Sequence, residues 1–357
     1  MRVLITADPY IPVPPVHYGG IERVIDLHIR ELIRRGHEVT LIAHPDSRTE
    51  ARLIPYGHPP HVGRLIRAQE LLQVGAVLWR LRRKVDVVHS FGRLAAMLPI
   101  LPLRHLPKLQ SYQRDIPWRS VQRTASLAGP SIIFTGCSSS VYRLRPATHT
   151  GDWRTIFNNV DMAMYTAQTS VEPDAPLVFL GRLDPIKGAH DAIAIARGAG
   201  RRLVIAGNKL TEGPDVGYFD AQIAPHVDGL HVSYVGPVDD AQKDRLLGGA
   251  AALLMPIAWE EPFGIVMAEA LACGTPVIAF SRGSVPDVVR DGVNGFACRT
   301  VDEAIAAVAR LPQIDRRAVR ADCDARFGGA VVSDAYESLY RELIVRVGSA
   351  RPAEARP

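Results

Sequence analysis

The most constraining feature of the sequence is a strand–loop–helix–strand pattern in its second half. Residues 251–257 form a short apolar run, which predicts a buried β-strand. A helix is expected after Pro262, with Phe263 and Gly264 in its first turn, and it should end at the Gly-Thr-Pro sequence that follows. Residues 277–280 predict the next strand. This order predicts a parallel βαβ crossover and therefore an α/β fold.

Two glutamates belong to this unit, one in the loop and one on the helix. Glu261 follows the first strand, and Glu269 lies about two turns along the helix, facing the same side if the helix is regular. The start of a helix exposes N–H groups that attract phosphate, and Gly264 lets a ligand approach that backbone closely. Such a site suits a ligand that carries both phosphate and hydroxyl groups, as a nucleotide sugar does. Each glutamate taken alone is equally consistent with a solvated surface position.

The surrounding string makes the pattern specific. The spacing from Glu261 to Glu269, with Pro-Phe-Gly after the first and Ala-Leu-Ala-Cys-Gly-Thr-Pro-Val after the second, resembles the donor-site signature of retaining GT-B glycosyltransferases of family 4. The similarity continues through residues 283–287 and 291–296. This resemblance implies an α/β GT-B fold, in which two Rossmann-like domains with parallel sheets face each other across a cleft.

The length of the chain agrees with two domains. It has 357 residues, 47% of them hydrophobic, which is enough for two separate cores. We expect an acceptor-binding domain over residues 1–165 and a nucleotide-sugar donor-binding domain over residues 166–329. The resemblance implies that a last helix, within residues 330–357, crosses back to the first domain.

The first half opens with a strand predicted over residues 3–7 and a helix predicted over residues 21–35. Gly19 and Gly20 precede that helix, where an open α/β sheet offers free N–H groups to a ligand. A plain helix-capping turn is the alternative. The resemblance favours a glycine loop that faces the donor phosphates and the acceptor. Residues 44–60 are predicted to form a loop.

His89 lies near the end of a strand predicted over residues 85–90. A histidine in this position is often a hydrogen-bonded core residue, and that alternative stays open. In the family that the chain resembles, a histidine after such a valine-rich strand lies beside the donor sugar. The resemblance therefore makes His89 a candidate catalytic residue that orients the sugar.

Two cations follow the first predicted strand of the second domain. Arg182 and Lys187 belong to the sequence Gly-Arg-Leu-Asp-Pro-Ile-Lys-Gly, which resembles the diphosphate clamp of the family. A guanidinium fork and an ammonium point charge both suit phosphate oxygens, whereas unrelated surface cations are the alternative. With Glu261, they are the other expected catalytic residues. The resemblance adds six donor-binding positions: Gly236 and Val238 for the base, and Phe263, Gly264, Ile265 and Val266 at the start of the helix.

Charge is distributed unevenly along the chain. Residues 1–165 hold 22 Lys and Arg against 12 Asp and Glu, while the whole chain has a net charge of +5. A basic half suits an anionic acceptor or peripheral binding to an anionic membrane. Nucleic acid is not an expected partner, because no nucleic-acid-binding motif accompanies the charge. No secretory signal, membrane-spanning run or metal-binding cysteine spacing is apparent, so we expect a cytoplasmic protein with reduced cysteines, which could sit at the inner face of the membrane.

The resemblance, together with these residues, predicts a hexosyltransferase, and the resemblance implies that it retains the anomeric configuration. It would move a sugar from a nucleoside-diphosphate sugar, with UDP favoured, to the hydroxyl of an unknown saccharide, glycolipid or small-molecule acceptor. The products would serve cell-surface polysaccharide, glycolipid or secondary-metabolite synthesis. Cations would replace a metal, so neither metal nor cofactor is expected. The alternatives are a sugar phosphorylase, a nucleotide-sugar epimerase and a non-catalytic nucleotide-sugar-binding subunit.

Overall fold

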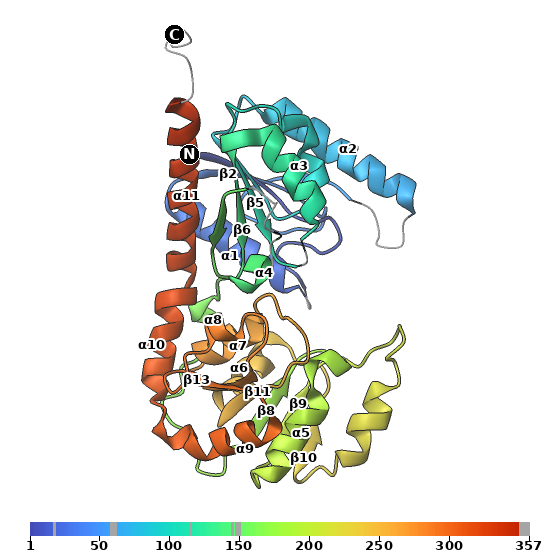
Figure 1. Ribbon diagram of the computed structural model, residues 1–357, viewed down its shortest axis with the longest axis vertical. Coiled ribbons are helices and arrows are strands. Elements are labelled where there is room, and N and C mark those ends of the chain that lie inside the picture. Colours follow the sequence, from blue (N-terminus) through green and yellow to red (C-terminus); the bar gives the residue numbers. More distant parts are fainter. Residues whose placement is uncertain (17–18, 58–62, 115, 144–145, 147–150, 350–357) are drawn as a thin grey trace. The chain divides into compact units, whose positions relative to one another are not determined.

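The computed structural model describes the chain except residues 17–18, 58–62, 115, 144–145, 147–150 and 350–357 (Figure 1). It divides into two compact units. Unit 1 comprises residues 1–159 and 329–357, and unit 2 comprises residues 160–328. The sequence predicted domain boundaries after residues 165 and 329. In the structure the chain passes from unit 1 to unit 2 after residue 159 and returns to unit 1 after residue 328. The end of the expected last segment, residues 350–357, lies outside the described residues.

Unit 1 is built on a parallel sheet of seven strands in the order β3-β2-β1-β4-β5-β6-β7. Its strands are β1 (Arg2–Thr6), β2 (Glu38–Ala43), β3 (Arg52–Pro55), β4 (Val87–Ser90), β5 (Lys108–Tyr112), β6 (Ile132–Gly136) and β7 (Trp153–Thr155). Val3 of β1 is in register with Val39 on one side and Val87 on the other. The chain therefore starts in the middle of the sheet and builds outward in both directions.

Helices cover both faces of this sheet because successive side chains of each strand point to opposite faces (Figure 1). Val3 and Ile5 pack into one core cluster with α1 (Gly20–Arg34) and α11 (Gly329–Ser349). Leu4, between them, packs into the other cluster with α2 (Arg64–Leu81), α3 (Trp118–Ala128) and the 3₁₀ helix η1 (Leu94–Ile100). The last long helix of the chain thus belongs to the core of unit 1. A short α4 (Ser140–Arg143) and the turn η2 (Gly129–Ser131) complete the unit.

Unit 2 is built on a second parallel sheet, of six strands in the order β10-β9-β8-β11-β12-β13. Its strands are β8 (Leu177–Leu180), β9 (Leu203–Ala206), β10 (Val232–Tyr234), β11 (Ala252–Met255), β12 (Val277–Phe280) and β13 (Gly295–Cys298). Its α-helices are α5 (Ala189–Gly198), α6 (Asp240–Gly248), α7 (Ile265–Ala272), α8 (Val285–Val288), α9 (Val301–Arg310) and α10 (Arg316–Phe327). The short helices are η3 (Met162–Met164), η4 (Pro185–Lys187), η5 (Phe219–Ile223), η6 (Ala224–His226) and η7 (Leu311–Gln313). The predicted βαβ crossover is β11–α7–β12, and the predicted α/β class with two parallel sheets is confirmed.

Two local predictions are wrong. Residues 44–60 were expected to form a loop, but β3 lies within them as an edge strand that pairs Leu41 of β2 with Leu53; residues 58–60 of this range are outside the described residues. The helix expected directly after Pro262 begins at Ile265, because Gly264 adopts a left-handed backbone (φ +71°) that cannot belong to a right-handed helix. All four cysteines are buried, and none of them forms a disulfide. In the described part of the chain, no helix has the length and apolar character that crossing a bilayer requires.

Candidate functional site

The strand order of unit 2 identifies the edge of the sheet where a ligand is expected. From β8 the chain proceeds to β9 and β10 on one side, and later to β11, β12 and β13 on the other. The loops after β8 and β11 therefore leave the sheet in opposite directions. In open parallel sheets, this reversal opens a crevice at the carboxyl ends of the strands, where ligands bind.

The two loops at this reversal are joined by their backbones. The N–H of Ala258 after β11 donates a hydrogen bond to the carbonyl of Ile186 after β8, at 2.9 Å. Gly188 has a left-handed backbone (φ +77°), and a β-carbon there would lie 2.0 Å from the carbonyl oxygen of Pro256. Only glycine permits this approach, so the end of the loop after β8 is fixed against the loop after β11.

Lys187 and Glu261, one from each loop, form the centre of this site. The Lys187 ammonium lies 2.5 Å from Oε2 of Glu261, which is largely buried. Trp259 donates its indole N–H to the same oxygen at 3.0 Å, and the Lys187 ammonium lies 4.8 Å from the centre of the Trp259 ring. The sequence places Lys187 and Glu261 far apart, and the sheet brings them together. Trp259 was not predicted, because a lone tryptophan in a loop carries no motif.

Arg182 is positioned by a neighbouring carboxylate. Its Nε and Nη2 donate to Oδ2 of Asp184 at 3.2 and 2.7 Å, while the Arg182 side chain stays about half exposed. The other oxygen of Asp184 accepts from the N–H of Ile186 at 3.3 Å and so caps η4, which ends at Lys187. Asp184 therefore orients both predicted cations, although sequence reasoning did not single it out.

Glu269 lies on α7 and is held by two donors. Its Oε1 accepts from the Tyr165 hydroxyl at 2.8 Å and from the Lys243 ammonium at 2.5 Å. The Glu269 residue is only 7% exposed, so the interpretation of it as a solvated helix residue is wrong. A buried carboxylate with two donors has one defined orientation, as a hydrogen-bond acceptor for a ligand requires.

The turn that leads into α7 is held in place by the loop after β12. A β-carbon at Gly283 would lie 2.3 Å from both the nitrogen and the oxygen of Glu261, and Ser284 donates its N–H to that oxygen at 2.8 Å. The Ser284 hydroxyl donates to the carbonyl of Phe263 at 2.8 Å. Phe263 itself is 2% exposed, so its side chain is not available to a ligand. Ile265 and Val266 form the first turn of α7, where N–H groups favour an anion.

Gly236 and Val238 lie in the loop after β10, at the same edge of the sheet. Gly236 has a left-handed backbone (φ +76°), and its missing side chain would meet open space. Its carbonyl accepts the N–H of Gly207, after β9, at 2.9 Å. The assignment of the base to this loop stays a prediction.

In unit 1, Gly19 is the N-cap of α1, and Gly20 is its first residue. A β-carbon at Gly19 would lie 2.8 Å from the carboxylate of Glu22, in the first turn of the helix. Glu22 is largely buried, and this burial raises the pKa of its carboxyl above the ordinary value. A carboxyl group therefore already lies at the start of α1, and the role of the two glycines in donor binding stays a prediction.

The expectation that His89 orients the donor sugar is wrong for this structure. His89 is 0% exposed, and its two ring nitrogens lie 2.5 Å from the hydroxyl of Tyr340 and 2.7 Å from that of Ser111. Burial lowers the pKa of His89 well below its ordinary value. A neutral ring with both nitrogens engaged inside the core of unit 1 has no atom to offer a substrate. It is a core histidine, the alternative that the sequence left open.

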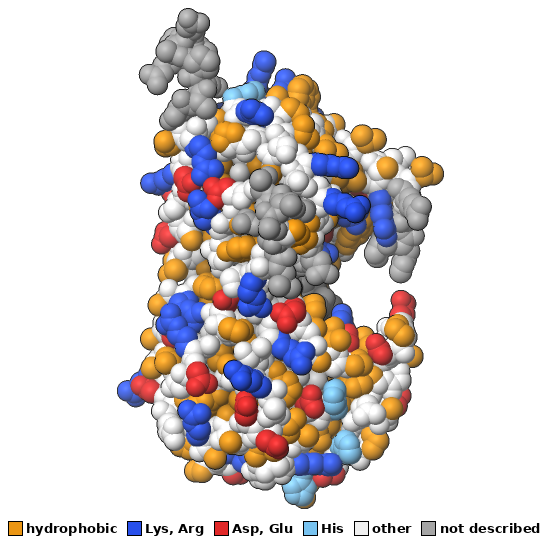
Figure 2. Space-filling model, viewed as in Figure 1, with side chains coloured by type: hydrophobic (Ala, Val, Ile, Leu, Met, Phe, Trp, Pro, Cys, Tyr) orange, Lys and Arg blue, Asp and Glu red, His pale blue; other side chains and the backbone are white. Residues whose placement is uncertain are grey.

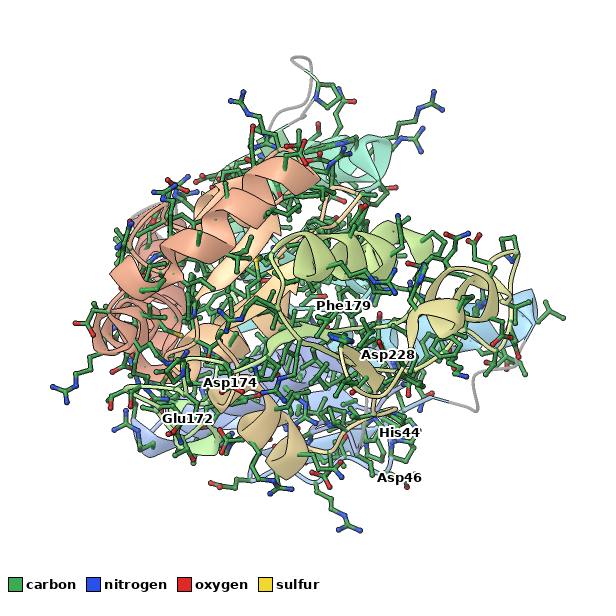
Figure 3. All side chains as sticks on the ribbon, turned by 90° about the horizontal axis from the view of Figure 1, so that it is seen from below. His44, Asp46, Glu172, Asp174, Phe179 and Asp228 are labelled. Atoms are coloured by element: carbon green, nitrogen blue, oxygen red, sulfur yellow. The ribbon has the colours of Figure 1, made fainter. Side chains whose placement is uncertain are left out.

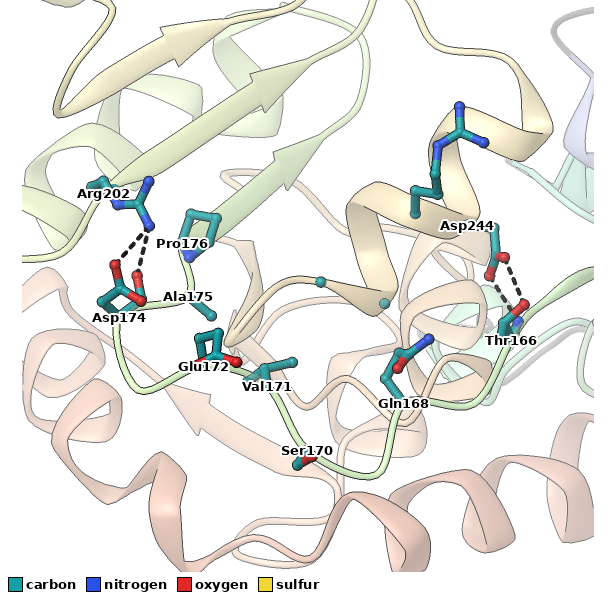
Figure 4. A pocket seen from close by; sticks show the side chains of 13 residues that line it. Thr166, Gln168, Ser170, Val171, Glu172, Asp174, Ala175, Pro176, Arg202 and Asp244 are labelled. Atoms are coloured by element: carbon teal, nitrogen blue, oxygen red, sulfur yellow. Dashed lines mark hydrogen bonds and ion pairs between the residues drawn. The ribbon is translucent and has the colours of Figure 1, made fainter.

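A cavity of about 650 Å³ in unit 2 lies away from these residues (Figure 4). It opens at the amino ends of β8 and β9 and is lined by the segment that contains Glu172 and Asp174, which Figure 3 also labels. Its main polar groups bond one another: Arg202 pairs with Asp174 at 3.1 Å, and Asp244 accepts from Thr166. A site at the amino edge is remote from the crevice that the strand order marks.

The surface shows the charge difference that the sequence predicts. On the face drawn in Figure 2, acidic side chains are sparse over unit 1, whereas acidic and basic side chains are mixed over unit 2. The two predicted cations of the site in unit 2, Arg182 and Lys187, are each paired with a carboxylate.

Comparison with known proteins identifies glycosyltransferase families in both halves of the chain. Residues 166–321 match the family "Glycosyl transferases group 1", and residues 18–130 match "Glycosyltransferase Family 4". The α-maltose-1-phosphate synthase of Mycobacterium tuberculosis is 25% identical over 96% of this chain and 100% of its own length.

Solved structures share the fold. AviGT4, a glycosyltransferase involved in avilamycin A biosynthesis, has a TM-score of 0.69 and is 27% identical over 96% of this chain and 98% of its own. HepE of Anabaena in complex with UDP-glucose has a TM-score of 0.72 at 18% identity, over 96% and 100% of the two chains, which concerns the fold alone. The chain therefore belongs to the glycosyltransferases of family 4 and group 1, with a two-domain GT-B fold.

Proposed function

We propose that the protein transfers a hexose from a UDP-sugar to the hydroxyl of an acceptor, with retention of the anomeric configuration. The observation that carries this proposal is the paired Lys187 and Glu261 at the β8–β11 reversal, with the half-exposed Arg182 in the same loop as Lys187. One similar structure supports the donor class, since HepE was solved in complex with UDP-glucose.

The cations would serve the leaving group. As the bond between the sugar carbon and the diphosphate oxygen breaks, negative charge develops on the diphosphate. Arg182 and Lys187, with the N–H groups that start α7, would stabilise this charge without a metal. Asp322 and Asp324 form an Asp-x-Asp sequence on α10, but Asp322 is bound to Arg326 and Asn294 within the unit, which indicates a structural role.

The carboxylates would hold hydroxyl groups. Glu261 would accept from the sugar and Glu269 from the ribose, and the backbone from Gly236 to Val238 would contact the base. Retention follows if the acceptor attacks the face that the diphosphate leaves. The acceptor oxygen then forms the new bond to the sugar carbon, and its proton passes to an oxygen of the departing phosphate.

Substitution of the two cations tests this proposal. We expect Arg182→Ala and Lys187→Ala each to reduce transfer from UDP-glucose by about 10²- to 10³-fold, by analogy with the removal of one charge-stabilising donor. Arg197→Ala is the matched control, since Arg197 is an exposed arginine on α5 that pairs with His226. Near-normal transfer by either cation variant, in a folded protein, would contradict the assignment.

A thermal-shift screen identifies the donor independently of the acceptor. A ligand that binds only the native state raises the melting temperature with its affinity. We expect UDP-sugars to stabilise the protein more than GDP- or ADP-sugars, and the Arg182→Ala variant to lose this shift. A larger shift with GDP- or ADP-sugars would contradict the choice of nucleotide and leave the reaction type standing.

A further inference from the structure

A second cavity, of about 570 Å³, opens at the carboxyl edge of the sheet of unit 1. Asp8 after β1, Gly92 after β4 and Gln113 after β5 line it, together with residues of η1 and α3. From β1 the chain adds β2 and β3 on one side of the sheet and then β4 on the other side, so the strand order reverses between β1 and β4. This cavity therefore has the position in unit 1 that the donor crevice has in unit 2.

Four buried polar atoms in residues that line this cavity have no hydrogen-bond partner among the described residues. They are Oδ1 of Asp8, Oε1 of Gln110, the hydroxyl of Tyr112 and Nε2 of Gln113. Folded proteins leave few buried polar atoms unpaired. Four such atoms around one cavity therefore indicate that a bound ligand supplies their missing hydrogen bonds. Two are acceptors, one is a donor, and the tyrosine hydroxyl is both. Hydroxyl groups, which donate and accept, match this set.

The outer part of the cavity is apolar. Leu98 of η1 is 56% exposed and Leu127 of α3 is 47% exposed, and both line it with the buried Leu94. Large exposed apolar side chains around a concave site favour an apolar ligand group. The cavity therefore combines a buried polar part with an exposed apolar part.

Two arginines of the lining already have partners. Arg114 pairs with Asp8 at 2.9 Å, and Arg93 donates to the Tyr10 hydroxyl at 2.9 Å. A third, Arg123, is exposed. An anion at the buried part would meet the carboxylate of Asp8, so charge is not the main feature that the cavity recognises there.

We infer that this cavity binds the acceptor, and that the acceptor is amphipathic: a hydroxylated sugar ring that carries an aliphatic substituent. The ring hydroxyls bond Asp8, Gln110 and Gln113, and the aliphatic group lies across Leu98 and Leu127. This inference rests on the proposed transfer reaction, because it names the class of molecule that receives the sugar.

Binding of matched glycosides tests the inference without any donor. Calorimetry or saturation-transfer NMR would compare methyl and octyl glycosides of glucose, galactose and mannose, with the octyl compounds below their micelle concentration. We expect at least one octyl glycoside to bind at least tenfold more tightly than its methyl counterpart, which corresponds to burial of about two methylene groups. Equal affinity within all three pairs would overturn the inference.

Four variants locate the effect. Leu98→Glu and Leu127→Glu should remove the preference for the octyl chain, whereas Leu72→Glu, at a leucine of α2 that is 73% exposed and outside the cavity, should leave it. Gln113→Leu should weaken the binding of methyl and octyl glycosides to the same extent. An octyl preference that survives the Leu98 and Leu127 changes would overturn the inference. UDP-glucose binding by the same samples reports on the proposed function separately, because its residues lie in unit 2.

Discussion

Single residues in the site act mainly by fixing the backbone that carries Glu261. Gly283 and Gly292 both have left-handed backbones (φ +55° and +73°), but only Gly283 lies against another segment. Alanine at either position should cost about 1–2 kcal/mol of backbone strain. At Gly283 the added β-carbon also overlaps Glu261, which should add about 1–3 kcal/mol.

Measurement of both variants separates strain from displacement. Denaturant unfolding should show the larger loss of stability for Gly283→Ala. UDP-glucose binding should weaken in that variant and stay unchanged in Gly292→Ala. If both variants bound the donor equally well, the support of Glu261 by Gly283 would not matter for the site.

Trp259 is a positioning residue at the same scale. Its indole N–H and the Lys187 ammonium share Oε2 of Glu261. Trp259→Phe keeps an aromatic ring under Lys187 and removes one hydrogen bond to a charged group, which is worth about 1.5–3 kcal/mol. We expect kcat/KM to fall about tenfold or more, at a matching free-energy cost. An unchanged kcat/KM, with the melting temperature as a control for folding, would show that Lys187 alone orients Glu261.

The site residues divide into those that a sequence can identify and those that it cannot. Recognisable sequence motifs contain four of them: Arg182, Lys187, Glu261 and Glu269. Their partners Trp259 and Asp184 are not singled out by a motif, and their importance appears only when the sheet brings the loops together. His89 shows the opposite error: its position after a strand suggested a site, but burial depends on α11, which follows far along the chain.

At the scale of elements, α11 is attached to unit 1 by a buried polar cluster. The hydroxyl of Tyr340 lies 2.9 Å from Nε2 of His28 on α1 and 2.5 Å from Nδ1 of His89 on β4. All three residues are fully buried. Tyr340→Phe would leave two imidazole nitrogens unpaired in the core, at about 1–3 kcal/mol each.

Denaturant unfolding of Tyr340→Phe checks this expectation. Tyr142→Phe is a suitable control, because the Tyr142 hydroxyl bonds Thr155 at 2.7 Å in a partly exposed position of the same unit, and its loss should cost about 1 kcal/mol. Equal losses in the two variants would mean that the cluster does not determine the attachment of α11.

Elements differ in how well their sequence predicts them. The β11–α7–β12 unit has a buried apolar strand, a helix and a glycine stop, so its local pattern and its fold agree. The edge strand β3 is short, its side chains are half-buried or exposed, and it ends at a proline, so no alternation distinguishes it from a loop. The start of α7 is set by the left-handed backbone of Gly264, a conformation that the local sequence does not reveal.

At the scale of the whole molecule, the two units should respond differently to acid. Burial lowers the pKa of His28 from 6.5 to about 3 and lowers that of His89 well below 6.5, and both belong to unit 1. In the unfolded chain, both histidines take up a proton as the pH falls through 6.5, whereas in the folded unit they stay neutral. The unfolded state then binds more protons, so stability is present above pH 6.5 and is lost progressively below it.

Below this pH, each histidine should lower the free energy of unfolding of unit 1 by about 1.4 kcal/mol per pH unit. Burial raises the pKa values of the Asp8 and Glu22 carboxyls, so their protonation favours the folded unit as the pH falls. This opposite effect occurs at a lower pH, near the ordinary pKa values of carboxyl groups. Hydrogen exchange followed by mass spectrometry between pH 7 and 5, corrected for the intrinsic rates, should show protection falling in α1, β4 and α11 before it falls in unit 2. His28→Gln removes one titrating group and should reduce the slope for unit 1 by about half. If the slope kept its wild-type value in this variant, or if unit 2 lost protection first, the acid sensitivity would have another origin than these two buried histidines.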